Sequence, residues 1–182
     1  FLPAARFYDS NLHALATVGM VNLSLQYGNC DGSCLAYATL SQVAGAHCLD
    51  DRAGYRFGQL GLDLVEQRGL VRFKARVYTV VGHHVWPRIR PLRDALALVH
   101  RACETARESG DFLFMAFSLA HVTAQRLALG DALADVQEEA ERSLTLMRKA
   151  CYRLLIDCMG QQLCLIWSLR GIAPEFTALG DE

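Results

Sequence analysis

Four turn positions divide this chain into segments of nearly equal length. Gly28, Gly69, Gly110 and Ala150 lie 41, 41 and 40 residues apart, and glycine at such positions can close a helix. A fixed period of this size is typical of stacked supersecondary units, each of which buries its apolar face only against its neighbours. The period therefore predicts a repeat architecture.

The proline and apolar patterns indicate that the repeating unit is a pair of helices. Between residues 11 and 86, and again between 92 and 173, no proline interrupts the chain. Apolar residues in 92–106 recur at the i, i+3, i+4, i+7 spacing of a helix that buries one stripe, whereas strand-like alternation is nowhere sustained. We predict helices at 12–27, 31–47, 51–68, 71–86, 91–109, 111–129, 132–149 and 151–170.

These helices predict an all-α fold, an α-solenoid of about four antiparallel pairs with a 40–41-residue repeat. Small residues at the same distance after three of the turns, Cys34, Ala75 and Ala116, favour close packing of the second helix of each pair. The helical-repeat domain is expected at 12–170. Residues 1–11 are then an entry connection or the end of a preceding helix, and 171–182 an exit linker. The period alone does not choose between tetratricopeptide-like and HEAT- or armadillo-like repeats.

Composition narrows the class of partner. With 52% apolar and 20% charged residues the chain can bury a core, and its net charge of -1 gives no overall electrostatic footprint for nucleic acid or an anionic membrane. It contains no uninterrupted apolar run of about 18 residues. Seven scattered cysteines fit neither a secreted disulfide framework nor a zinc ribbon. We expect a cytoplasmic protein with reduced thiols, without nucleic-acid or membrane partners.

Motifs for catalysis are not found. There is no phosphate-binding loop, and Lys74 and Lys149 both lie in helical contexts. Gly54, Gly58 and Gly61 fall at helical spacing, which favours close helix packing over phosphate binding, because an anion-binding loop must leave the helix. We therefore predict that this segment is not an enzyme and needs no cofactor. An enzymatic function, which would require a cleft with convergent polar groups, is the least favoured alternative.

Two histidines are the strongest candidates for a metal site. His83 and His84 precede Trp86 at a predicted helix end, where capping or packing is the favoured interpretation. Metal binding would need further ligands, and His47 or Cys48 could join them only through the fold. We predict no metal site, with metal binding at these histidines as the less favoured alternative.

Cysteine pairs give a weaker signal. Cys30 and Cys34 stand four residues apart and could share a helix face, but a second ligand pair with matching spacing is missing. Buried cysteines are the favoured interpretation. No motif selects a nucleophilic cysteine–histidine pair from the seven cysteines and six histidines.

Several stretches of the chain resemble a region of large bacterial multidomain kinases. They are DRAGYRFGQLGLDLVEQRGL (51–70), RFKARVY (72–78), GHHVWP (82–87), MVNLSLQYGN (20–29) and LIWSLRG (165–171), so the resemblance covers most of residues 11–175. These trifunctional proteins combine a serine/threonine kinase domain, an AAA-type signal-transduction ATPase, this helical region, a GAF domain and often a sensor histidine kinase. The resemblance implies a tetratricopeptide-like right-handed superhelix between the ATPase and the GAF domain, and it carries over no catalytic residue.

The first functional hypothesis is a sensor or scaffold whose groove binds a protein, a peptide or a small effector. Helix-pair solenoids present an extended concave surface that suits this role. Tyr55, Arg56 and Gln59, on the first helix of the second pair, are the candidate groove residues, with a core position equally open for Tyr55. The resemblance implies intramolecular contacts with ATPase, kinase and GAF domains, whose activity the bound partner would regulate.

The second hypothesis is architectural. The array would space catalytic domains, or form a homodimer through exposed apolar end faces, without a ligand of its own. Phe112, Phe114 and Phe117 would then serve as packing or contact residues.

Overall fold

The computed structural model describes residues 8–47, 50–150 and 152–172. Every regular element in these ranges is helical, which confirms the all-α prediction, and the predicted helices agree with the observed ones to within a few residues except at the end of the fourth. The elements are α2 (Ser10–Tyr27), α3 (Ser33–His47), α4 (Asp51–Gln67), α5 (Val71–Val80), the π-helix η1 (Val81–Val85), the 3-10 helix η2 (Trp86–Arg88), α6 (Leu92–Ser109), α7 (Phe112–Leu129), α8 (Leu133–Lys149) and α9 (Arg153–Leu169).

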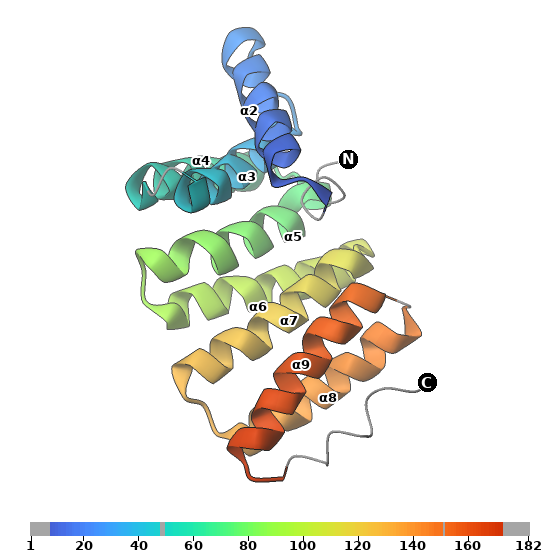
Figure 1. The fold of residues 1–182 in the computed structure, drawn as a ribbon. Coiled ribbons are helices and arrows are strands. Elements are labelled where there is room, and N and C mark those ends of the chain that lie inside the picture. The colour runs from blue at the N-terminus through green and yellow to red at the C-terminus, as the bar shows by residue number, and fades with distance from the viewer. Residues whose placement is uncertain (1–7, 48–49, 151, 173–182) are drawn as a thin grey trace.

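Each helix packs against the next along the chain, and the alternate helices α3, α5, α7 and α9 also contact one another in that order. Figure 1 shows α5 to α9 lying side by side, while α2 projects from the end at a steep angle to α3 and α4. Two apolar clusters fill the space between the helices. One centres on Tyr37, Val65 and Tyr78, and the other on Met159 and Ile166.

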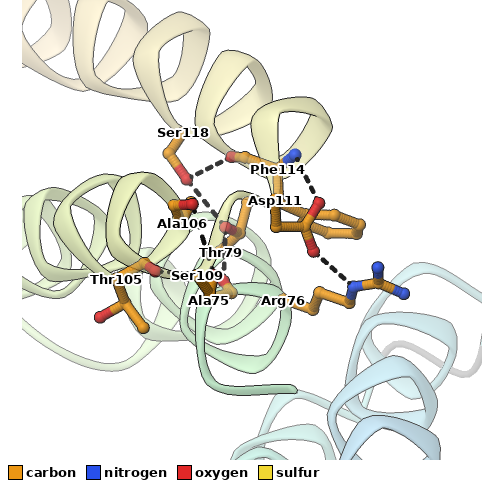
Figure 2. A network of polar contacts seen from close by, with 9 residues as sticks. All are labelled: Ala75, Arg76, Thr79, Thr105, Ala106, Ser109, Asp111, Phe114 and Ser118. Carbon is orange, nitrogen blue, oxygen red and sulfur yellow. Dashed lines mark hydrogen bonds and ion pairs between the residues drawn. The ribbon is translucent and has the colours of Figure 1, made fainter. Parts of the chain in front are cut away.

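Turn chemistry explains how α6 ends and α7 begins. Gly110 has φ 71°, the left-handed conformation that glycine adopts without steric cost. The next residue, Asp111, accepts a hydrogen bond from the Phe114 backbone N–H at 3.4 Å and so caps α7. Its second carboxylate oxygen accepts from Nε of Arg76 on α5 at 2.7 Å (Figure 2). One aspartate therefore both starts a helix and ties it to the preceding pair.

A buried pair of hydroxyl groups lies at the contact between α5 and α7. Oγ1 of Thr79 and Oγ of Ser118 are 2.9 Å apart (Figure 2). Each hydroxyl also lies within hydrogen-bond distance of a backbone carbonyl oxygen one turn earlier in its own helix, Thr79 of Ala75 and Ser118 of Phe114. Both side chains are almost fully buried. Because buried polar groups are costly unless they are hydrogen-bonded, this pair favours one register of α5 against α7.

The predicted helix at 71–86 is wrong in its last turn. The α-helix ends at Val80, a π-helix follows, and a short 3-10 helix begins at Trp86. Pro87 has no N–H to continue an α-helix, and its ring clashes with the preceding turn. The histidines assigned to a helix end therefore lie within a π turn.

Helix α7 is the one helix among the described residues whose length and apolar composition would suffice to cross a membrane, with a mean hydropathy of 1.3 over 18 residues. It contacts α5, α6, α8 and α9. The buried surface of α7 includes polar residues, among them Ser118, Thr123 and Gln125. One third of this window, 33%, is buried against other helices, and a single helix of this kind is weak evidence for a membrane span.

Candidate functional site

The three predicted groove residues lie around one open hollow on α4. Its volume is about 640 Å³, and the α4 residues that line it are Ala53, Tyr55, Arg56, Phe57, Gln59, Leu60 and Asp63. The helix begins where the side chain of Asp50 accepts a hydrogen bond from the Ala53 backbone N–H at 2.8 Å. This cap places the hollow within the first three turns of α4.

Glycines hold the opposite face of α4 against its neighbours. A Cβ on Gly61 would lie 2.7 Å from the backbone oxygen of Cys34 and 3.1 Å from the backbone nitrogen of Ala38, both on α3. A Cβ on Gly58 would lie 3.3 Å from Cγ1 of Val85. The packing interpretation of this glycine run is therefore confirmed at Gly58 and Gly61. Close contact with α3 on this side leaves the hollow on the other.

Tyr55 is half-buried and is held in place by a cation. Its hydroxyl oxygen accepts hydrogen bonds from Arg90, from Nε at 3.1 Å and from Nη2 at 2.7 Å. The Arg90 guanidinium also lies 5.5 Å from the centre of the Tyr55 ring and 4.4 Å from that of Trp86. The Tyr55 ring packs against the apolar cluster around Tyr37, Val65 and Tyr78, and it also lines the hollow. A core position and a groove position therefore each describe part of this side chain. Sequence reasoning missed Arg90 and Trp86.

The remaining polar groups of the hollow offer both a charge and an acceptor. Arg56 is exposed and forms no ion pair with the residues that the structure describes. Gln59 donates from Nε2 to Oδ1 of Asp63 at 2.8 Å. Its Oε1 is buried and accepts no hydrogen bond from the described part of the chain. A buried acceptor without a donor is unfavourable, and a ligand N–H group in the hollow could reach this oxygen only after the Gln59 side chain rotates.

A second group of reactive side chains lies between α5 and α7. His83 and His84, from the π turn, meet His121 from α7, and one ring nitrogen of each lies within 4.8 Å of those of the other two. No local motif could have identified His121, because only the packing of α7 on the π turn brings it there. The other candidates suggested by sequence do not enter this group, since the side chain of His47 and the whole of Cys48 lie outside the described residues.

The two cysteines near the start of α3 lie in different environments. Cys34 is buried, as expected, and burial raises the pKa of its thiol to about 11. Cys30 is exposed and precedes the helix, which corrects the expectation that it is buried. A hydrogen bond with Ser33 lowers the pKa of the Cys30 thiol. The pair does not share one helix face, and the five described cysteines are all free thiols.

Comparisons with protein-family models, curated proteins and solved structures give no match to this chain. The resemblance to multidomain kinases accordingly remains an expectation from the sequence. What the chain does must be inferred from its own residues, and the α4 hollow brings aromatic, charged and amide groups together.

Proposed function

We propose that this chain is a non-catalytic helical-repeat module that binds a peptide segment of a partner protein in the α4 hollow. The observation that carries the proposal is the convergence of Tyr55, Arg56 and Gln59 on that one hollow. In a multidomain kinase of the kind that the sequence resembles, the bound segment would regulate the neighbouring ATPase and kinase domains.

A repeat architecture supports this function. Turns near Gly28, Gly69, Gly110 and Ala150 each join two successive helices, and the alternate helices contact one another. We propose that the four pairs form an α-solenoid with a 40–41-residue repeat, with a right-handed tetratricopeptide-like superhelix as the resemblance implies. Such arrays bind extended partners on an exposed helix surface.

The chemistry of the hollow indicates the type of peptide. Tyr55, Phe57 and Leu60 offer apolar surface for one apolar side chain. Arg56 offers an exposed guanidinium, which suits a carboxylate because the two can form paired hydrogen bonds. Once its side chain rotates toward the hollow, Oε1 of Gln59 can accept a backbone N–H. We therefore propose a partner segment in which an acidic residue stands next to a leucine or an aromatic residue.

The charge of Arg56 provides a direct test. Selection from a displayed library of short peptides is expected to enrich acidic residues beside apolar ones. Arg56→Glu is expected to weaken binding of the selected peptides by roughly tenfold or more in fluorescence anisotropy, because a like charge would then face the acidic residue. The reason for choosing Arg56 is that its exposed side chain is not required for packing.

Arg148→Glu is the matched control, because Arg148 is an exposed arginine on α8, a helix that packs against α7 and α9 and not against α4. It is expected to bind the selected peptides like the original chain. Equal losses in the two variants would mean that only net charge matters, and no enrichment at all would contradict the proposal.

Helix α2 favours the architectural alternative. Its buried residues include Thr17 and Ser24, whereas Leu15 and Leu25 are 71% and 68% exposed. An apolar surface of this kind is typical of an interface, so a homodimer or a docked neighbouring domain would cover it. Of the three phenylalanines considered for this role, Phe112 is exposed, whereas Phe114 and Phe117 are partly buried. Light scattering over a range of concentrations tests this alternative, which a stable dimer without peptide binding would support.

A further inference from the structure

Three imidazole rings come together where the π turn after α5 meets α7. The rings of His83 and His121 stack with their centres 3.5 Å apart and their planes 10° from parallel. His84 meets His83 edge-on, with ring centres 4.7 Å apart, and lies 5.8 Å from His121. All three side chains are partly buried, and any two of them offer ring nitrogens within 4.8 Å. Three histidines are a common ligand set of a transition-metal ion.

The π turn is what places consecutive histidines together at α7. Gly82, immediately before them, lies so close to α6 that a Cβ would be 2.9 Å from Cγ2 of Val99. Single π turns inside helices are rare and occur frequently at functional sites. The backbone at Gly82 is also fixed from α7, since Gln125 donates from Nε2 to its carbonyl oxygen at 2.9 Å. Contacts with α6 and with α7 therefore fix the backbone of the turn that carries the two histidines.

Helix α7 supplies the third histidine and its surroundings. Gln125 follows His121 by one helical turn and is 4% exposed. Its Oε1 is buried and accepts no hydrogen bond from the residues that the structure describes. Imidazoles that bind metal donate their other ring N–H to a nearby acceptor, which orients the ring. A buried amide oxygen one turn from His121 is an acceptor of this kind.

We propose that His83, His84 and His121 bind one divalent ion of the later transition metals, with Zn²⁺ as the simplest representative. Imidazole nitrogen suits Zn²⁺, Ni²⁺ and Cu²⁺, whereas Mg²⁺ and Ca²⁺ require oxygen ligands. Zinc–nitrogen distances of about 2.0–2.1 Å place tetrahedral donors roughly 3.4 Å apart. Rotation of the side chains by about 1.5 Å closes the widest pair to that spacing. The ion then joins the π-helix η1 to α7, with its fourth position open to water.

The competing interpretation is that the histidines only pack. Phe117 also stacks on His121, with ring centres 6.4 Å apart, so the cluster belongs to a larger aromatic contact. A packing role requires only the aromatic rings, whereas metal binding requires their ring nitrogens. Asparagine substitutions remove a strong ligand while keeping a polar side chain, and metal titration therefore separates the two interpretations.

The test is equilibrium dialysis of the chain against Zn²⁺, combined with thermal unfolding. One ion per chain is expected, with a rise in Tm of roughly 5 °C at saturating zinc that a chelator reverses. His84→Asn and His121→Asn are each expected to weaken binding by at least about tenfold, since even indirect partners of metal ligands have effects of that size. Circular dichroism establishes that each variant remains helical, and either variant alone is sufficient if the other fails to fold.

Two variants control for binding elsewhere. His100→Asn changes an exposed histidine on α6, and Cys30→Ser removes the exposed thiol, so both are expected to retain zinc binding. Absence of saturable binding by the original chain would overturn the proposal. It would also be overturned if zinc bound equally well to folded His84→Asn, or if Cys30→Ser abolished binding.

Discussion

Gly61→Ala is expected to lower the free energy of unfolding by about 2–3 kcal/mol, the upper part of the usual range for overpacking a core. The new Cβ would lie 2.7 Å from the backbone oxygen of Cys34 and 3.1 Å from the backbone nitrogen of Ala38. Neither is the end of a flexible side chain, so α4 must move away from α3. Urea unfolding followed by circular dichroism measures the effect. The expected loss already includes the small stabilisation that the higher helix propensity of alanine contributes.

Gly160→Ala is the matched control. Gly160 lies inside α9, and a Cβ there would meet no atom within 4 Å. Alanine at this position is expected to raise the free energy of unfolding by about 0.5–1 kcal/mol, because only the helix-propensity term remains. If both glycine variants shifted the stability in the same direction, the close approach of α4 to α3 would be wrong.

Tyr78→Ala is expected to have the largest effect, a loss of about 4 kcal/mol in the free energy of unfolding. The side chain is 1% exposed and lies in the core between α3, α4 and α5. Its removal deletes an aromatic ring and leaves a cavity that the surrounding helices cannot fill completely. The same urea measurement applies, and a thermal midpoint lowered by roughly 10 °C should accompany it.

Tyr78→Phe separates the ring from the hydroxyl group. The hydroxyl donates to a carboxylate oxygen of Glu66 and accepts from Nη2 of Arg101 at 3.0 Å. These partners are largely exposed, so losing the hydroxyl is expected to reduce the free energy of unfolding by only about 1 kcal/mol. Equal losses for the alanine and phenylalanine variants would contradict the assignment of most of the effect to packing.

The helices were predictable because their boundaries depend on local chemistry. Gly110 ends α6 in the left-handed conformation, and Asp111 begins α7 with a side-chain cap. Both effects involve residues only a few positions apart, so they can be inferred from sequence without knowledge of the fold. The run of Gly58 and Gly61 was likewise interpretable, since close packing is the usual reason for glycines at helical spacing.

The π turn and the histidine cluster were not predictable in this way. Pro87 limits the α-helix locally, but the contact of Gly82 with Val99 and the hydrogen bond from Gln125 join the turn to other helices. His121 stands far from His83 in the sequence and carries no motif of its own. The α4 hollow was partly predictable, because Tyr55, Arg56 and Gln59 follow from helix position, but the role of Arg90 depends on a distant turn.

Peptide binding at α4 is tested most directly by hydrogen exchange, with and without a peptide selected by the chain. The backbone amides of residues 53–63 are expected to exchange more slowly in the complex, because the peptide excludes water and suppresses local opening of this helix. The helices α8 and α9 should remain unchanged. Protection confined to α2, or protection equally strong in the Arg56→Glu variant, would contradict the assignment of the binding site to the α4 hollow.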